Sequence, residues 1–213
     1  MEAGLFFNGL IEYANLTGDT QYDSLVSEAL LFQAGVNYTY PFRPNSENEV
    51  YNDHQCAWAQ TAMTAAEVGF RRPDNGSWVG LSIDMFDVIA NRWDVGLCDG
   101  GLTTAAYTFA DRFYADMAAN SNFFLLASRL ARFTKNQTYS EWAEKVFDWS
   151  KDAGLLSENY VVFDGGRGKD NCTTIDHDAW TYMHGLFTEG TAVMYQNVST
   201  SLVELWNAAK QVG

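Results

Sequence analysis

The feature that most constrains the fold is a helical period of apolar residues that returns along nearly the whole chain. Apolar residues three and four positions apart share one face of an α-helix, so each such stretch predicts an amphipathic helix. In the clearest stretch, Tyr139, Trp142, Val146 and Trp149 follow this spacing, which predicts that both tryptophans are core residues. The predicted helices cover residues 3–15, 17–35, 53–70, 80–93, 120–133, 138–152, 177–195 and 199–210.

The same spacing of apolar residues predicts which face of each of the first two helices is apolar. The residues that share these faces are Phe6, Leu10 and Tyr13 in the first helix and Tyr22, Leu25, Ala29 and Phe32 in the second. Both faces are predicted to pack against the rest of the molecule.

Two links between predicted helices are very short: TGDT joins the first two, and KNQT joins the fifth and sixth. Short links make consecutive helices antiparallel, so these pairs are predicted helix hairpins. Longer links at 36–52, 94–119 and 154–176 hold most of the unusual polar residues, and NYVVFDGG at 159–166 is typical of a short strand entering a turn. With three prolines in 213 residues, the sequence predicts one all-α domain over 1–213, with at most a two-stranded element.

The charge balance excludes several classes of partner. The formal net charge is −14, and such an acidic surface repels nucleic-acid phosphates and anionic membrane surfaces. No apolar stretch reaches the roughly 18 residues that a membrane-spanning helix needs. The first ten residues lack the basic start and long apolar core of a signal peptide, so a secreted protein would carry its signal outside this sequence.

Two observations favour the secretory pathway, although a cytoplasmic location stays open. Cys98 and Cys172 fall in predicted loops, where a disulfide is feasible, whereas Cys56 falls inside a helix pattern as a small buried hydrophobe. Six Asn-x-Ser/Thr sequons are also present, at Asn15, Asn37, Asn75, Asn136, Asn171 and Asn197.

The stretch VYNDHQCAWAQTAMTAAE at 50–67 is the first candidate site. Asn52 and Asp53 open a predicted helix, and their ordinary role would be that of an N-cap. However, Asp53 and His54 are adjacent titratable groups at a helix N-terminus. The helix dipole stabilises a carboxylate there as the anion, which suits a nucleophile or a base.

The stretch LCDGGL at 97–102 is the second candidate. Gly100 and Gly101 allow positive φ and the close approach of a ligand, and Asp99 beside them is a candidate second carboxylate. A plain turn held by Cys98 is the alternative.

The stretch NCTTIDHDAWTYMHG at 171–185 is the third candidate. His177 and His184 are seven residues apart and so share roughly one helix face. No metal-ligand spacing is present, so neither a metal site nor a cofactor is predicted. A structural role is the usual one for a single histidine, but all three histidines lie in or near loops, which favours proton transfer.

Three tryptophans outside the regular stripes, Trp58, Trp93 and Trp180, lie near loop junctions. Tryptophan in such places forms sugar-stacking or other apolar walls of a cleft.

These stretches together resemble glycoside hydrolase family 76, which contains bacterial endo-α-1,6-mannanases and fungal cell-wall proteins that process mannan or anchor glycans. The phrases that carry the resemblance are EAGLFFNGLIEYANLTGDTQYDSLVSEALLFQAG, YNDHQCAWAQTAMTAAE, RWDVGLCDGGL, NFFLLASRLARFTKNQTYSEWAEKVFDWSKDAGLL, VVFDGG, NCT and WTYMHGLFTEGTAVMYQN, in family order. The resemblance implies an (α/α) toroid of six helix hairpins around a cleft. Family domains are longer, so about four hairpins are expected here, and a homodimer would cover the open edge.

The resemblance implies an altered catalytic pair. The family has two adjacent aspartates at the start of this helix; the first matches Asp53, but the second is replaced by His54. The family's Gly-Gly-Gly-Leu-Arg-Trp stretch reads DGGLTT, with Asp99 in place of a glycine. We therefore predict Asp53 as nucleophile or base and His54 or Asp99 as proton donor, with weak or absent mannan hydrolysis.

The predicted substrate-binding residues are Asn52, Trp58, Trp93, Gly100, Gly101, His177, Trp180 and His184. We expect Asp53, His54, Asp99, His177 and His184 to gather in one cleft, because alternate helices of hairpins begin at the same end. The substrate is an oligosaccharide or a small molecule. Two alternatives remain open at this point: a scaffold recruited to cyclise or isomerise an apolar metabolite, and a non-catalytic glycan-binding relative.

Overall fold

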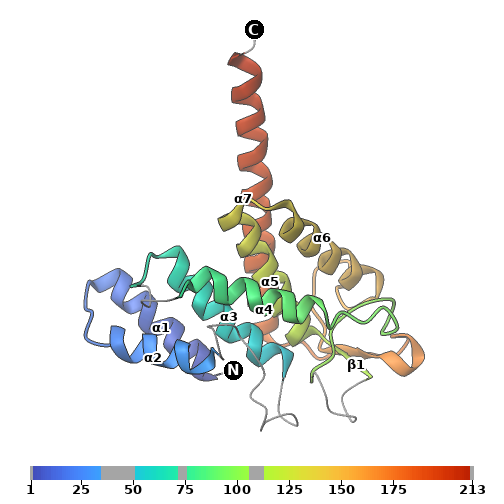
Figure 1. The fold of residues 1–213 in the computed structure, drawn as a ribbon. Coiled ribbons are helices and arrows are strands. Elements are labelled where there is room, and N and C mark those ends of the chain that lie inside the picture. Colours follow the sequence, from blue (N-terminus) through green and yellow to red (C-terminus); the bar gives the residue numbers. More distant parts are fainter. Residues whose placement is uncertain (1, 35–50, 72–75, 106–112, 212–213) are drawn as a thin grey trace.

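A computed structural model describes residues 2–34, 51–71, 76–105 and 113–211, with side chains up to residue 197. Most of the predicted link 36–52 and part of 94–119 lie outside these ranges. The elements in chain order are α1 (Glu2–Thr17), α2 (Asp23–Gln33), α3 (Asn52–Glu67), α4 (Trp78–Ala90), β1 (Tyr114–Asp116), α5 (Met117–Thr134), α6 (Gln137–Asp152), β2 (Gly165–Arg167), the 3₁₀ turn η2 (Gly168–Asp170), β3 (Ile175–Asp176) and α7 (Thr181–Gln211) (Figure 1). The prediction of a mostly helical fold is confirmed.

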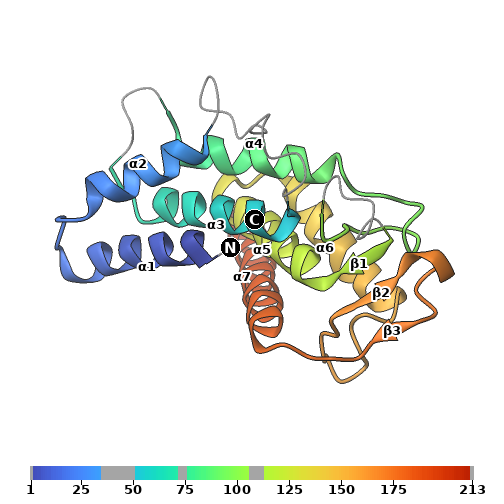
Figure 2. The ribbon, with the colours of Figure 1, turned by 90° about the horizontal axis from the view of Figure 1, so that it is seen from below.

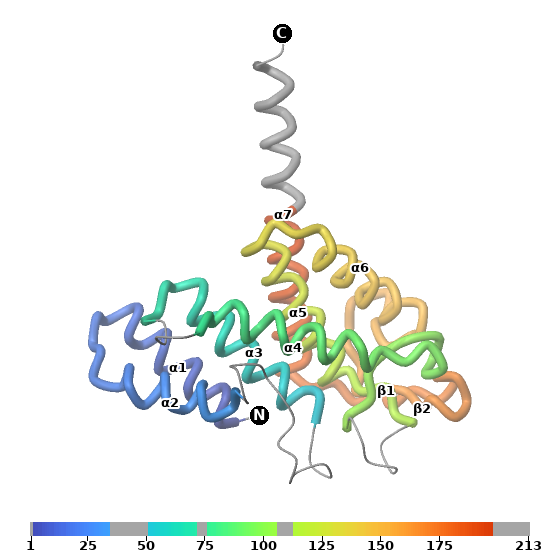
Figure 3. The backbone as a smooth tube through the Cα atoms, viewed as in Figure 1, coloured from blue at the N-terminus to red at the C-terminus, as the bar shows by residue number. Residues whose placement is uncertain are grey.

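The helices form an inner and an outer set. The inner helices pack in the order α1, α3, α5, α7, and α2, α4 and α6 pack against α1, α3 and α5, respectively. Figure 2 shows α2 and α4 on the outer side of α1 and α3, and Figure 3 traces the chain through the hairpins. Helix α5 is the centre of the core, since every residue from Met117 to Ala131 is buried.

The two short links end their helices as predicted, although the boundaries differ. Gly18 has a φ of 73° after α1, and Lys135 takes the left-handed conformation after α5. Asp19 accepts a hydrogen bond from the backbone N–H of Gln21, so the expected capping residue shapes the turn, and α2 begins only at Asp23.

Two predictions about regular elements are corrected. The two predicted helices at 177–195 and 199–210 are one helix, α7, because no glycine or proline interrupts residues 191–211. This helix begins only at Thr181, so His177 precedes it, and the prediction that His177 and His184 share a helix face is wrong. The strands form a three-stranded antiparallel sheet rather than two strands, with Ala115 opposite Gly166 and Gly166 opposite Ile175. Strands of two or three residues are too short for alternation to reveal them.

The predicted core faces of α1 and α2 are also corrected. Phe6 is 61% exposed and Phe32 is 63% exposed, whereas Ile11 and Val26 are buried. Both helices are apolar around more than one face, so the period alone does not select the face that meets α3. Among the described residues, no helix combines the length and the apolar character needed to cross a membrane.

Candidate active site

The N-terminal ends of the inner helices meet at one end of the molecule. His54, in the first turn of α3, interacts electrostatically with Glu2 at the start of α1. The charge of Asp53 acts on Asp116, the N-cap of α5. The charges of Asp53 and Asp116 both act on Tyr182, in the first turn of α7. This arrangement follows from the hairpin connectivity, which makes alternate helices begin at the same end.

The backbone at 102–105 joins the starts of α3 and α5. The Asn52 N–H donates to the carbonyl of Thr104 at 3.0 Å, and the Asp116 N–H donates to the carbonyl of Leu102 at 3.2 Å. The Asn120 side chain bonds to both the N–H and the carbonyl of Leu102. The segment therefore fixes the position of Asp53 relative to Asp116.

Asp53 is 8% exposed, and its Oδ1 accepts a hydrogen bond from the backbone N–H of His54 at 2.8 Å. The N-cap position of α3 is held by Tyr51 without a side-chain capping bond, so the ordinary capping role for Asn52 or Asp53 is wrong. Asn52 is instead buried, and its amide donates to the carbonyl of Thr103 and accepts from Arg92 at 2.7 Å each. Its predicted contact with substrate is thus replaced, in this structure, by bonds within the protein.

Next to Asp53, the His54 Nε2 lies 3.8 Å from its Oδ2. Burial lowers the pKa of His54, and the charge of Asp53 opposes this shift without reversing it. The imidazole is therefore mainly neutral at pH 7. A neutral imidazole lacks the acidic proton that a proton donor must supply.

A polar group that sequence reasoning missed is built on Asp164. Its carboxylate accepts hydrogen bonds from the Tyr114 hydroxyl and, at 2.8 Å, from the indole Nε1–H of Trp180. Trp180 is 50% exposed, so one carboxylate fixes the orientation of a solvent-facing indole. Such a fixed aromatic face is suited to stacking on a sugar ring.

Tyr182 completes this part of the site. Burial, together with the charges of Asp116, Asp53 and Asp164, raises its pKa to about 12. Its hydroxyl therefore remains protonated and can donate a hydrogen bond to a bound ligand or to a neighbouring carboxylate. The side chain is 41% exposed.

Asp116 is the most strongly perturbed carboxyl group of the site. Burial raises its pKa to about 7, assisted by the negative charges of Asp53 and Asp164 and opposed by hydrogen bonds from Ala118 N–H and Thr104. One signal for it exists in the sequence, because Asp116 directly precedes the apolar run of α5, at a helix start comparable to that of Asp53 in the first turn of α3. Asp164 and Tyr182 carry no comparable local signal.

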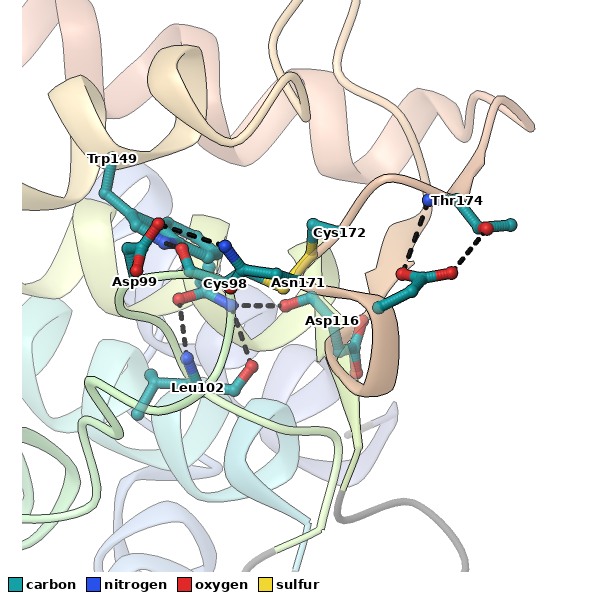
Figure 4. Close-up of a disulfide and its surroundings, with 10 residues drawn as sticks. Cys98, Asp99, Leu102, Asp116, Trp149, Asn171, Cys172 and Thr174 are labelled. Carbon is teal, nitrogen blue, oxygen red and sulfur yellow. Dashed lines mark hydrogen bonds between the residues drawn. A yellow bond between two sulfur atoms is a disulfide. The ribbon is translucent and has the colours of Figure 1, made fainter.

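Asp99 lies away from this group, in a cavity of about 520 Å³ that is lined by Trp93, Cys98, Asp99, Lys145, Asp148, Trp149, Asp152, Ala153, Asn171 and Cys172. Its Oδ2 accepts a hydrogen bond from the Asn171 amide at 3.1 Å. Figure 4 shows Asp99 and Trp149 on one side of the disulfide and Asp116 on the other.

Cys98 and Cys172, for which the sequence left a disulfide open, are bonded in the structure, with Cα atoms 5.3 Å apart, and Cys56 is the buried free thiol that was expected. The Trp149 indole N–H donates to the carbonyl of Cys98 at 2.9 Å. The buried position predicted for Trp149 is thereby confirmed, whereas Trp142 is only partly buried.

Gly100 and Gly101 have φ values of 153° and 115°, and both pack against indole rings. A Cβ atom on Gly100 would lie 2.8 Å from Trp93, and one on Gly101 would lie 2.4 Å from Trp149. The close approach that the glycines allow is thus made by tryptophan rings in this structure.

The remaining predicted site residues have partners of their own. The His184 Nε2 accepts the Val162 N–H at 3.1 Å, so its proton lies on Nδ1, 3.2 Å from the carbonyl of Trp180. The His177 ring packs edge-on against Phe163, and Trp58 stacks on Phe7. Trp93 packs edge-on against Trp149.

Among the five residues expected to gather in one cleft, the contacts join Asp53 to His54, while Asp99, His177 and His184 contact other groups. The structure instead brings Asp116 and Tyr182 into the electrostatic surroundings of Asp53, and it brings Asp164 into those of Asp116 and Tyr182. Within the described parts of the chain, no group of three or more His, Cys, Asp or Glu side chains is arranged to hold a metal ion.

Comparison with known proteins agrees with this geometry. The model of glycosyl hydrolase family 76 matches residues 1–209. The mannan endo-1,6-alpha-mannosidase DFG5 of Saccharomyces cerevisiae is 38% identical over 220 residues, covering 98% of this chain and 48% of that protein. The crystal structure of Dfg5 from Chaetomium thermophilum in complex with glucosamine is 37% identical, with a TM-score of 0.87, over 93% of this chain and 49% of that one.

A more distant structure is the inactive variant of an α-1,6-mannanase of a Salegentibacter species, with two adjacent aspartates replaced and α-1,6-mannotetrose bound. It is 17% identical to this chain with a TM-score of 0.70, and the match covers 91% of this chain and 53% of that one. This similarity shows a shared fold. This chain spans about half the length of the relatives that it matches. The similarity over almost all of the 213 residues shows that the chain belongs to glycosyl hydrolase family 76.

Proposed function

We propose that this chain acts on α-1,6-mannosides at the site around Asp53, with slower hydrolysis than family members that have two adjacent aspartates. The observation that carries the proposal is the position of Asp53. It is the residue that matches the first aspartate of the family pair, and it lies where the N-terminal ends of the inner helices meet. Asp53 acts as the nucleophile or base.

The surroundings of Asp53 favour a glycoside over an apolar metabolite. Asp116, Asp164, Tyr114 and Tyr182 supply carboxyl and hydroxyl groups, and Trp180 supplies an exposed aromatic face. Sugar recognition needs this combination of hydrogen-bonding groups and a flat apolar surface. Two structural relatives, one in complex with glucosamine and one with α-1,6-mannotetrose, support the same class of ligand.

The proposal places the natural protein in the secretory pathway, where disulfides such as Cys98–Cys172 form and persist. Asn15 and Asn136 are exposed, whereas the Asn171 amide is engaged by Asp99; Asn37 and Asn75 lie outside the described residues. A homodimer covering the open edge of the toroid stays a prediction.

The proposal is tested by incubating the purified protein with α-1,6-mannotetraose and following products by mass spectrometry. We expect slow release of shorter α-1,6-mannooligosaccharides and no cleavage of matched α-1,2- and α-1,3-linked controls. Calorimetry on the same samples separates the alternatives. Binding without any products would support the non-catalytic glycan-binding protein, and absence of both binding and products would overturn the proposal.

A further inference from the structure

We propose that Asp116 is the proton donor of this site, the carboxyl group that works with Asp53 in place of the second aspartate of the family pair. The inference rests on the proposed function and deepens it, because it names a catalytic group that the family motif does not supply. Its starting point is the replacement at position 54, which leaves Asp53 without an adjacent carboxyl group.

The position of Asp116 fits this role. It ends β1 and caps α5, where its Oδ1 accepts the Ala118 N–H at 2.8 Å. Its carbonyl is held by the Asn120 amide at 2.7 Å. Asp116 is 6% exposed and Asp53 is 8% exposed, so the two carboxyl groups are buried to the same degree at the same end of the inner helices.

The other candidates for the donor are less suitable. His54 adjoins Asp53, but its lowered pKa leaves the ring mainly neutral at pH 7. Asp99 lines the cavity beyond the disulfide and is engaged by Asn171. The Asp164 carboxylate is engaged by hydrogen bonds from the Tyr114 hydroxyl and the Trp180 indole, which it holds in place.

Two negative charges act on Asp116 from other parts of the fold. Asp53 acts from α3 and Asp164 from the residue before β2, and the uncharged Tyr182 on α7 is in turn acted on by all three aspartates. Because its pKa lies near 7, Asp116 holds a proton in weakly acidic solution and loses it as the pH rises. The donor form is therefore present below pH 7 and is lost above it.

The step balances as an ordinary glycoside hydrolysis. The Asp53 carboxylate attacks the anomeric carbon and forms an ester as the glycosidic C–O bond breaks, and the Asp116 proton passes to the leaving oxygen. Water then attacks the anomeric carbon, its proton returns to Asp116, and Asp53 is released as the carboxylate.

The test is a double-mutant comparison of D116N in the natural and the H54D backgrounds, with turnover of α-1,6-mannotetraose as the readout. Asparagine keeps the oxygen that caps α5 but cannot donate an acidic proton. In the natural background, D116N should lower turnover about 100-fold or more, since general acid catalysis contributes roughly 10²–10⁴. In the H54D background, where the family pair is restored, the same substitution should change turnover less than about 5-fold.

The pH profile adds a second readout. Turnover by the natural chain should fall as the pH rises through about 7, and this limb should be absent from D116N. Equal losses in both backgrounds would assign Asp116 a structural role and overturn the proposal. A D116N rate equal to that of the natural chain would also overturn the proposal, and so would turnover that appears only in the H54D background. Either of these two results would leave the proposed substrate class standing. No turnover by either background would instead remove the proposed function and this inference with it.

Discussion

Replacing Asp53 by asparagine should abolish the turnover of α-1,6-mannosides, with a loss of at least about 10³-fold, because an amide cannot act as the nucleophile or base. Substrate binding should change much less, since asparagine keeps the shape of the side chain and the oxygen that accepts the His54 N–H. The measurement is the rate of product formation from α-1,6-mannotetraose, together with the dissociation constant from calorimetry.

The matched control is Asp99→Asn, which makes the same chemical change in the cavity beyond the disulfide. We expect this variant to retain its rate within about threefold, as is usual for a carboxyl group remote from the reacting bond. A larger loss in D99N than in D53N would move the catalytic site to the Gly-rich loop and contradict the assignment.

Replacing Arg129 by methionine should lower the free energy of unfolding by about 3–5 kcal/mol, the cost of breaking a buried ion pair from one side. Arg129 is 7% exposed and bonds to Glu67 Oε2 at 2.7 Å, Gln60 Oε1 at 2.8 Å and Thr64 Oγ1 at 2.8 Å. It thereby connects α5 to α3 in the core. The measurement is urea-induced unfolding at pH 7.

Arg132→Met is the matched control, because Arg132 donates to the same carboxylate from a side chain that is 36% exposed. Its loss should cost about 1 kcal/mol or less, as for other exposed ion pairs. Equal losses from the two variants would show that the buried network is not what stabilises the α3–α5 contact.

The effect of R129M should also depend on pH. Burial raises the pKa of Glu67, but hydrogen bonds and charge from Arg129 and Arg132 outweigh it, so the net shift is downward. A lowered folded pKa gives stability that is present above the unfolded value of 4.5 and is lost as the pH falls through the folded value. The gap between the natural chain and R129M should therefore narrow in acid.

The sequence was sufficient to predict the helices and the hairpin connections, because these depend on periodicity and on chemistry local to the chain. The apolar stripe of α6 and the short link at Lys135 are examples. The sequence left the Cys98–Cys172 disulfide open, because that bond joins residues 74 positions apart. The period could not select the buried face of α1, since Phe6 and Ile11 lie on different apolar faces and only the neighbouring helix decides between them.

The candidate site could be predicted only in part. Asp53 lies in a recognisable motif at a helix start, but tertiary contacts between distant segments bring Tyr182 near it and Asp164 near Asp116 and Tyr182. By contrast, Gly100 and Gly101 have the composition of a ligand-binding loop, but the rings of Trp93 and Trp149 occupy the space that a side chain at these positions would need. A local pattern shows that space is needed, but not which group occupies it.

The central claim is that sugars bind on the side of Asp53 and Trp180 rather than in the cavity of Asp99. The most direct measurement is a titration of the ¹⁵N-labelled protein with α-1,6-mannotriose, following the indole N–H signals of its seven tryptophans by NMR. The Trp180 signal should shift in a saturable manner, because its indole is exposed and fixed by Asp164, while the signals of Trp93 and Trp149 should stay in place. Saturable shifts of Trp93 and Trp149 with an unmoved Trp180 signal would contradict the account.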